Sequence, residues 1–430
     1  MSQPLRIGVA GLGTVGAGVL QILDRHAALI AHRCGRPIQV TAVSARHASR
    51  DRGVSLDGMK WYDDPVGLAS DPNVDVVAEL IGGSDGPAAD LVKAALAAGK
   101  SVVTANKALI ARQGPGLAEM AAANGAALRF EAAVAGGIPI IKSLSEGLAG
   151  NRLSRIYGIL NGTCNYILTE MEETGRAFED VLAEAQQLGY AEADPSFDVD
   201  GIDAAHKLAI LTSVAFGTEL DFASVFVEGI RRITPHDIEF AAELGYRIKL
   251  IGIATCTDTG VLQRVHPCLV SLDTAIAHVN GVFNAVVAEG DFVGQTVYQG
   301  RGAGAGPTAS AVVADLVDIA RGNTHPVLSP PVAAMRDTRR LDMDSNEGRF
   351  YVRLTVLDRP GVIAEVASAL RDESVSMEEL LQRPKGSGQP VSVVMTTHEV
   401  AEDKMMRALA RIAKLPFTAE KPEAIRIETF

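Results

Sequence analysis

With 430 residues, 47% of them hydrophobic and 21% charged, the chain is long enough for about three soluble domains with apolar cores. A net charge of -12 and a pI near 5.3 argue against a nucleic-acid partner, and no apolar stretch reaches the roughly 18 residues of a membrane span. Four cysteines without CxxC spacing, and strand-like sequence from Leu5 where a secretory leader would stand, predict a cytoplasmic protein acting on small molecules.

The first predicted elements are a short apolar strand, a glycine-rich turn and an apolar helix. The turn reads G-x-G-x-x-G at Gly11, Gly13 and Gly16, with Thr14 and Val15 between the last two glycines. Glycine permits the tight turn, the close approach of a pyrophosphate and the packing of helix on strand, and the helix N-terminus offers free amides. We therefore predict that these five residues bind a dinucleotide, and a purely structural glycine turn is the alternative.

The next predicted strand, residues 38–45, bears on which dinucleotide is bound. NAD-selective sites usually place Asp or Glu at the end of this strand, where it binds the ribose 2'-hydroxyl. This chain has Ser44 and Ala45 there, followed by Arg46, and an arginine can accommodate a 2'-phosphate. The pattern favours NADP over NAD, with a solvated surface charge as the alternative role of Arg46.

Two further strand and turn units extend the predicted dinucleotide-binding domain. Residues 74–83 are almost continuously apolar and end in glycines, as is typical of a buried parallel strand. Residues 100–111 contain a strand that leads into Thr104 and Lys107 at the carboxyl edge of the sheet, where ligands collect. A lysine after a strand is also common on protein surfaces, so position alone leaves both roles of Lys107 open.

Beyond about residue 131 the pattern changes to that of a mostly antiparallel domain. Residues 151–171 predict a strand, a polar turn at Asn161 to Thr163 and a helix. Alternating stretches at residues 227–233, 250–257 and 264–272 predict further strands. A glycine-rich loop and an amphipathic helix at residues 300–321 predict that the chain returns to the nucleotide or substrate cleft.

An acidic segment leads into a helix that carries Lys207 and then no charge up to Gly217. This apolar run predicts a helix buried on most sides, and Asp203, four residues before Lys207, shares its face. Burial lowers the pKa of a lysine while a nearby carboxylate raises it, and this competition can make a lysine a proton donor. An ordinary exposed ion pair is the alternative, whereas Lys207 at the twelfth position excludes an EF-hand calcium loop. The acidic residues are Glu192, Asp194, Asp198, Asp200 and Asp203.

The C-terminal part begins with a proline-containing, charged stretch, residues 323–345, which predicts a linker. The order strand, helix, strand, strand, helix follows, which is most of a ferredoxin-like unit. The turn from Asp358 to Gly361, between its first strand and first helix, suits a small regulatory fold that binds amino acids.

Six of these stretches, in this order, resemble homoserine dehydrogenase over about residues 5–322, and the tail from about Arg349 resembles an ACT domain. No kinase domain precedes Leu5, so the resemblance is to the monofunctional form. The sequence departs from the family pattern at GGSDGPA, residues 82–88. In the family pattern, the glycine pair is expected to run more directly into the proline. The matching stretches are GLGTVG, VVTANKALIA, FEAAVAGGIPIIKSL, GILNGTCNYILTEM, LGYAEADPSFDVDGIDAAHKLAIL and GRGAGAGPTASAVVADL.

The resemblance implies three domains in an α/β protein. The parts are a Rossmann domain over residues 1–131, completed by about 303–325, an α+β catalytic and dimerisation domain over 132–302, a linker over 326–348 and a ferredoxin-like ACT domain over 349–430. A homodimer or homotetramer follows from the resemblance, as does feedback inhibition by threonine. An ACT domain that acts only in subunit contacts is the alternative.

The activity implied by the resemblance is reversible NAD(P)-dependent reduction of L-aspartate 4-semialdehyde to L-homoserine, in threonine, methionine and isoleucine biosynthesis. By position, Lys207 becomes the proton donor with Asp203 beside it, and Glu192 and Asp198 bind the substrate amino group. Lys107 lies near cofactor and substrate. The cofactor is also expected to contact Thr104 and Gly304, and a structural sodium ion is expected at the carbonyl groups of Glu131, Val134, Gly136 and Ile138.

Two other functions compete with this one. An aldehyde dehydrogenase acting through Cys164 needs a thiol of lowered pKa and a base, and no histidine is placed by motif to help. A nucleotide- and amino-acid-sensing regulator without turnover would not need the acidic and lysine cluster around Lys207.

Overall fold

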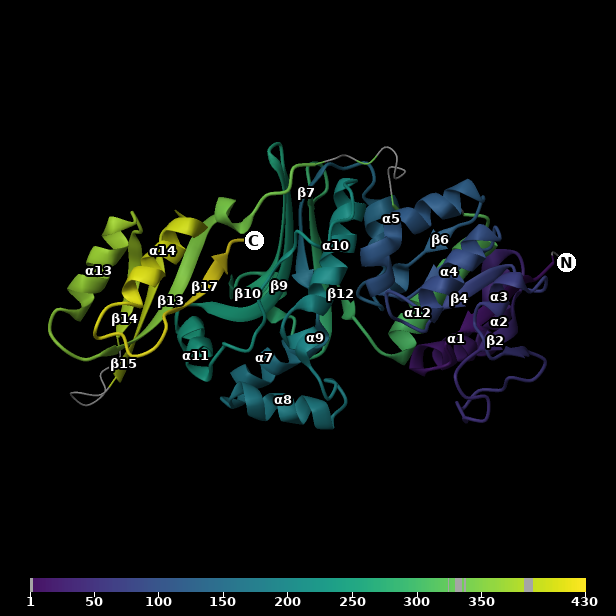
Figure 1. The fold of residues 1–430 in the computed structure, drawn as a ribbon, viewed down its shortest axis with the longest axis horizontal. Coiled ribbons are helices and arrows are strands. Elements are labelled where there is room, and N and C mark those ends of the chain that lie inside the picture. Colours follow the sequence, from purple (N-terminus) through teal and green to yellow (C-terminus); the bar gives the residue numbers. More distant parts are fainter. Residues whose placement is uncertain (1–2, 324, 329–334, 336–337, 383–389) are drawn as a thin grey trace.

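The computed structural model describes residues 3–323, 325–328, 335, 338–382 and 390–430, which form three domains along the long axis of the molecule (Figure 1). The N-terminal domain contains a parallel sheet in the order β3-β2-β1-β4-β5-β6. This is the strand order of a dinucleotide-binding doubly wound fold, so the predicted Rossmann domain is confirmed. Its strands are β1 (Leu5–Ala10), β2 (Ile38–Ser44), β3 (Lys60–Tyr62), β4 (Val76–Glu79), β5 (Ser101–Thr104) and β6 (Leu128–Arg129).

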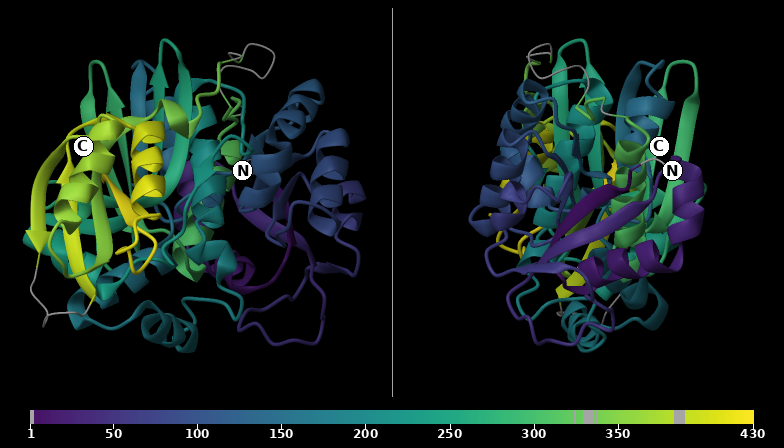
Figure 2. Two further views of the ribbon diagram at one scale, coloured as in Figure 1. Left: turned by 60° about the vertical axis from the view of Figure 1, so that its left-hand side comes forward. Right: turned by 90° about the vertical axis from the view of Figure 1, so that its right-hand side faces the viewer.

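Helices cover both faces of this sheet (Figure 2, right). The alternating side chains of β1 separate two cores: Ile7 and Val9 pack with α1 and α12, and Ala10 packs on the side of α4 and α5. Helix α12 packs on α1, so the chain returns from the middle domain to the N-terminal domain. The helices are α1 (Thr14–Arg25), α2 (Ala27–Cys34), α3 (Gly67–Ser70), α4 (Pro87–Ala97), α5 (Lys107–Ala123) and α12 (Ala305–Ala320).

The middle domain is built on an antiparallel run of strands in the order β12-β11-β7-β9-β10, as predicted. Helices α7 and α10 pack against these strands, and α10 is buried along most of its length. The strands are β7 (Leu153–Ile159), β8 (Phe226–Val227), β9 (Tyr246–Thr257), β10 (Gly260–Ser271), β11 (Phe283–Gly290) and β12 (Gly294–Arg301), and the helices are α6 (Ile140–Lys142), α7 (Gly162–Thr174), α8 (Phe178–Gln187), α9 (Ser196–Val199), α10 (Ile202–Phe216) and α11 (Pro235–Glu243).

The C-terminal domain is the predicted ferredoxin-like unit, completed by a strand that the sequence did not indicate. Its sheet has the order β17-β13-β15-β14, and α13 packs against α14. The last strand, β17, makes the unit β-α-β-β-α-β. The elements are β13 (Glu347–Leu357), α13 (Val362–Asp372), β14 (Met377–Gln382), β15 (Pro390–Thr397), β16 (Val400–Ala401), α14 (Glu402–Ile412) and β17 (Glu423–Glu428).

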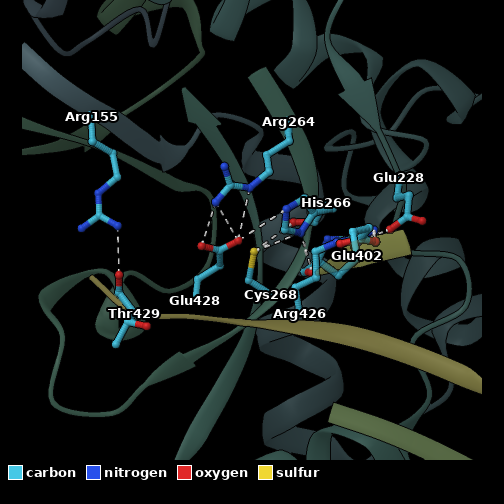
Figure 3. A network of polar contacts seen from close by, with 10 residues as sticks. Arg155, Glu228, Arg264, His266, Cys268, Glu402, Arg426, Glu428 and Thr429 are labelled. Atoms are coloured by element: carbon cyan, nitrogen blue, oxygen red, sulfur yellow. Dashed lines mark hydrogen bonds and ion pairs between the residues drawn. The ribbon is translucent and has the colours of Figure 1, made fainter. Parts of the chain in front are cut away.

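Strand β17 also joins the C-terminal domain to the middle domain. It pairs in parallel with β10, so the two sheets form one continuous sheet. Figure 3 shows a charged network at this junction, in which Arg264 Nη2 donates to both oxygens of Glu428 at 3.0 Å. After β17, the ring of Phe430 stacks on Tyr157 with centroids 3.9 Å apart. The C-terminal domain is therefore anchored to the sheet of the middle domain by both a strand and an aromatic contact.

One predicted strand is wrong in most of its length. Of residues 227–233, only Val227 belongs to a strand, and the chain then leaves the sheet to pack on α9 through a hydrogen bond from Ile230 N to Val199 O of 2.9 Å. Ile230 and Ile233 are both buried, and their spacing of three is not the period of a strand.

The predicted linker lies in part outside the described residues. Among the described residues, no helix has the length and apolar character needed to cross a membrane.

Candidate active site

A cluster of charged side chains lies where the N-terminal domain meets the middle domain. Lys207, on α10, donates from Nζ to Asp203 Oδ2 at 2.8 Å and to Leu160 O at 2.7 Å. Lys107, the first residue of α5 in the other domain, lies 2.9 Å from the second oxygen, Oδ1, of Asp203. One buried carboxylate is thus shared by two ammonium groups from two domains, and the exposed ion pair considered for Asp203 and Lys207 is excluded because both are buried.

The charges in this cluster perturb one another strongly. Burial alone would raise the pKa of Asp203, but the ammonium groups of Lys207 and Lys107 hold that pKa well below its ordinary range. Burial alone would lower the pKa of Lys107, but Asp203, with smaller contributions from Asp198 and Glu192, raises it. Asp203 is therefore ionised at any pH near neutrality.

Asp198 lies on the short helix α9 beside this cluster. Burial and the charge of Asp203 raise the pKa of Asp198, against the opposing effects of Asn161 and the two lysines. Glu192 precedes α9 in an exposed loop, close enough for its charge to act on Lys107. These carboxylates form an acidic rim next to two lysines, which suits a ligand that carries both an ammonium group and a polarised oxygen.

The remaining two acids of the segment have structural contacts. Asp194 accepts a hydrogen bond from Ser196 N at 3.1 Å, just before α9 begins. Asp200 pairs with Arg231, whose Nε lies 2.5 Å from Asp200 Oδ1. Both contacts fix the position of α9, and hence of Asp198.

The glycine-rich turn has the geometry that its sequence predicts. Gly11 has a φ of +95°, and a Cβ on it would lie 2.4 Å from Leu80 O, so only glycine fits. Gly13 has open space around its Cβ position, directly before the N-terminus of α1 at Thr14. Gly11 N donates to Ser44 O at 2.9 Å, and Arg46 follows as an exposed side chain. The turn, Val15, Gly16 and Arg46 are thus grouped at the carboxyl ends of β1 and β2.

Glu79, at the end of β4, is a buried residue of this edge that sequence reasoning missed. Its Oε1 accepts hydrogen bonds from Ile81 N at 2.8 Å and Gly82 N at 3.0 Å, and its Oε2 accepts one from Thr104 Oγ1 at 2.6 Å. Glu79 therefore ties the loop after β4, where the family pattern departs, to the loop after β5. A single acid at the end of an apolar strand was the available signal.

The loop after β5 places Lys107. Thr104 Oγ1 accepts from Asn106 N at 2.9 Å, and Asn106 caps α5 by accepting from Leu109 N at 3.1 Å. Asn106 Nδ2 also donates to Gly83 O at 2.7 Å. Because Lys107 directly follows this cap, its side chain leaves the nucleotide-binding sheet toward α10.

Gly304, with a φ of +117°, directly precedes α12 at the point where the chain returns from the middle domain. In the preceding loop, a Cβ on Gly302 would overlap the buried Asn284 side chain, at 2.2 Å. Gly137 N, in the segment of the predicted sodium site, donates to Arg301 O at 2.9 Å. The glycine loop and the segment around Gly136 are therefore in direct contact.

Cys164 does not have the properties of a nucleophile. It is fully buried in α7, and its Sγ donates to Asp198 O at 3.2 Å. Burial and the nearby carboxylates of Asp198 and Asp203 raise the pKa of this thiol well above its ordinary value. A reactive cysteine needs the opposite shift, so Cys164 is a packed small residue.

A second group of metal-ligating residue types lies at the C-terminal junction. Ligand atoms of His266, Cys268 and Glu428 lie within 4.8 Å of one another (Figure 3). Arg264 already binds both oxygens of Glu428. Burial lowers the pKa of His266, and the guanidinium groups of Arg426 and Arg264 lower it further. Two fixed positive charges oppose a cation there, so we interpret this group as part of the domain junction.

The matching family models are those described as homoserine dehydrogenase, over residues 139–317, homoserine dehydrogenase NAD binding domain, over residues 11–131, and ACT domain, over residues 350–417. The chain is 46% identical over 435 residues to homoserine dehydrogenase of Pseudomonas aeruginosa, with 99% of each chain covered. The crystal structure of a homoserine dehydrogenase from Thiobacillus denitrificans matches with a TM-score of 0.93 and 46% identity, covering 99% of this chain and 98% of that one. A hyperthermophilic archaeal homoserine dehydrogenase in complex with NADPH matches with a TM-score of 0.63 and 29% identity, covering 73% of this chain and 97% of that one.

Proposed function

The chain belongs to the homoserine dehydrogenase family, and from this premise we propose that Lys207 donates the proton that completes the reduction of L-aspartate 4-semialdehyde to L-homoserine. The observation that carries this role is the position of Lys207, buried on α10 and hydrogen-bonded to Asp203. A regulator without turnover has no use for a buried lysine that shares its carboxylate with a second lysine.

The chemistry follows from where negative charge develops. A nicotinamide dinucleotide held at the glycine-rich turn would supply a hydride to the aldehyde carbon, and the electron pair of the C=O bond would move to oxygen. Lys207 gives its proton to that oxygen as the charge develops, and its ammonium stabilises the charge before transfer. In the reverse direction, neutral Lys207 removes the hydroxyl proton of homoserine. Asp203, held ionised between two lysines, fixes the position of Lys207 in both directions.

The acidic rim next to the two lysines suits the ammonium group of the substrate, which does not react. We assign Asp198 and Glu192 to the substrate ammonium group, and Lys107 to the region between cofactor and substrate. Support comes from the position of Lys107, which reaches Asp203 from the nucleotide-binding domain. The direct test is homoserine-dependent reduction of NADP and NAD by the purified chain, monitored by absorbance. Absence of reduction with both cofactors would refute the assignment of substrate.

We assign the dinucleotide to the glycine-rich turn, Thr104 and Gly304, with NADP preferred over NAD. The exposed Arg46 after β2 supports the preference, since a guanidinium binds phosphate well and the described residues place no carboxylate in an ion pair with it. Replacement of Arg46 by alanine is expected to lower kcat/KM with NADP by about tenfold or more, because a charge-assisted hydrogen bond is lost, and to leave the value with NAD almost unchanged.

The control for this cofactor measurement is Arg25→Ala, which removes an exposed arginine at the opposite end of α1. It should leave both kcat/KM values unchanged. An unaltered ratio of the NADP and NAD values in Arg46→Ala would remove Arg46 from the binding site.

We assign the sodium ion to the carbonyl oxygens of Glu131, Val134, Gly136 and Ile138. All four residues are buried. No hydrogen bond from the described residues reaches the carbonyl oxygens of Val134 and Gly136. A buried carbonyl group without a donor is costly, and a hard cation that takes oxygen ligands satisfies it.

A homo-oligomer, dimer or tetramer, is supported by the open edge of the large sheet. β12 is the edge strand, and it carries no charge from Gly294 to Gly300. Val297 is 43% exposed on this strand, and Phe292, in the turn that leads to it, is 90% exposed. Uncharged, apolar edge strands are normally protected by a partner, and a second copy of the chain would provide one.

Feedback inhibition by threonine is assigned to the ACT domain, at the exposed turn that follows β13. Asp358 is exposed in this turn and is suited to bind the ammonium group of an amino acid. We expect Asp358→Asn to raise the threonine concentration for half inhibition by about tenfold, through loss of a charged hydrogen bond. The measurement is a threonine titration of aldehyde reduction with the full chain, because truncation would also remove β17 from the catalytic sheet.

Asp403→Asn is the matched control for the threonine titration. This acid is partly exposed, pairs with Arg407 and lies at the start of α14, at the other end of the ACT sheet. Its titration curve should match that of the unmodified chain. If Asp358→Asn also gives the unmodified curve, the turn is not the effector site.

A further inference from the structure

Asn161 occupies the short connection between β7 and α7, and the residue before it, Leu160, accepts the hydrogen bond of Lys207. The side chain of Asn161 is 3% exposed. Its Oδ1 accepts from Cys164 N at 2.8 Å, which caps the N-terminus of α7. From its sequence position alone, Asn161 is an ordinary turn and cap residue.

The other half of the amide has a different set of partners. Asn161 Nδ2 donates to Asp198 Oδ1 at 2.8 Å and to Asp203 Oδ2 at 2.8 Å. Because Oδ1 faces a backbone N–H and Nδ2 faces two carboxylates, the orientation of the amide is fixed by its partners. Both Nδ2 hydrogens are used, and each goes to a different acid.

These two acids have different tasks in the proposed function. Asp203 holds the two lysines, and Asp198 is assigned to the substrate ammonium group. The buried carboxylate of Asp203 and the half-buried carboxylate of Asp198 repel each other, and a shared neutral donor between them offsets this repulsion without competing for either lysine. We propose that Asn161 is a positioning residue that links the substrate carboxylate, Asp198, to the catalytic carboxylate, Asp203, and keeps Asp198 ionised for substrate binding.

The charges around Asp198 determine how its titration should respond. Asp203 and Lys207 face it from α10, Lys107 faces it from α5, and the neutral thiol of Cys164 contacts its backbone from α7. Asp203 raises the pKa of Asp198, whereas the two lysines and Asn161 lower it. Loss of the Asn161 donor therefore moves the pKa of Asp198 upward, and a negative charge at position 161 moves it farther.

The test is Asn161→Asp, which keeps the size of the side chain and its capping oxygen, removes the double donor and adds a negative charge. The measurement is the pH dependence of kcat/KM for reduction of aspartate semialdehyde with NADPH. The acid limb of this profile reports protonation of the carboxylates in the site, among them Asp198. The acid limb should move up by about one pH unit or more, which lowers kcat/KM about tenfold on that limb, while the Kd for NADPH stays unchanged.

Asn161→Ser is the second variant, because serine also caps helices but is too short to reach both acids. It should fold and show the same direction of shift. Asn151→Asp, the same change in a loop outside the site, should leave the profile unaltered. The proposal rests on the proposed function, yet the two fail differently: an unmodified chain inactive on the semialdehyde overturns the function. If the unmodified chain is active, but the folded Asn161 variants have the same acid limb in their pH profile as the unmodified chain, only the role of Asn161 is overturned.

Discussion

Replacing Lys207 with methionine is expected to lower kcat for semialdehyde reduction by about 10²- to 10⁴-fold, the usual range for loss of a general acid. Methionine has a similar length and no proton to give, so oxygen would have to take its proton from water. Lys107 cannot substitute, because its ammonium lies on the other oxygen of Asp203 and belongs to the nucleotide-binding domain. The Kd for NADPH should remain unchanged, since the glycine-rich turn is untouched.

Steady-state rates with NADPH and semialdehyde check this expectation, together with cofactor binding by fluorescence. Lys100→Met is the matched control, because Lys100 is a partly buried lysine outside the site whose Nζ, like that of Lys207, donates to backbone carbonyl groups, at Leu68 O and Asp71 O. It should retain the kcat of the unmodified chain. Full activity in Lys207→Met would transfer the role of proton donor to another group.

Local patterns in the sequence were enough to predict the parts of the site that lie close together along the chain. Gly11 to Gly16 predict a nucleotide turn because strand, glycines and helix N-terminus are adjacent. Asp203 and Lys207 predict a shared helix face because they are four residues apart and an apolar run follows. Both inferences depend only on the periods of helix and strand, and the structure has both features.

Contacts between distant segments were beyond such reasoning. Lys107 reaches Asp203 only because two domains meet, and Asn161, taken as a turn residue, links two acids through a geometry that spacing does not encode. The C-terminal strand β17 was missed for the same reason, since its partner β10 lies far away in the sequence. Residues 227–233 show a third limit of prediction from sequence. Their hydrophobic residues were interpreted as those of a strand, although they are three apart and are buried by a short turn.

Asp203→Asn is expected to reduce both stability and activity. The substitution keeps the shape but leaves the buried ammonium group of Lys207 and the half-buried one of Lys107 without their counter-charge. Removing one partner of a buried ion pair typically costs about 3–5 kcal/mol, so the free energy of unfolding at pH 7 should fall by about 3 kcal/mol. Lys207 also loses the carboxylate that fixes its position, and kcat/KM for semialdehyde reduction should fall by about 10²-fold or more.

The pH dependence of this difference gives an independent check by urea unfolding. The folded-state pKa of Asp203 lies below its unfolded value of about 4, so its stabilisation is fully present above that pH and is lost as the pH falls further. The difference in free energy of unfolding between the unmodified chain and Asp203→Asn should therefore be constant from pH 5 to 7, on the order of 3 kcal/mol. This difference should become smaller below about pH 4.

Asp237→Asn separates lost stability from lost chemistry. Asp237 is also a buried acid in an ion pair, with Oδ1 at 2.7 Å from Arg353 Nε, but it lies at the junction with the ACT domain. Its replacement should lower the free energy of unfolding while the folded protein retains its kcat. If Asp203→Asn behaved in the same way, with stability reduced and kcat preserved, Asp203 would only hold two domains together, and the placement of Lys207 for proton transfer would have to come from Leu160 alone.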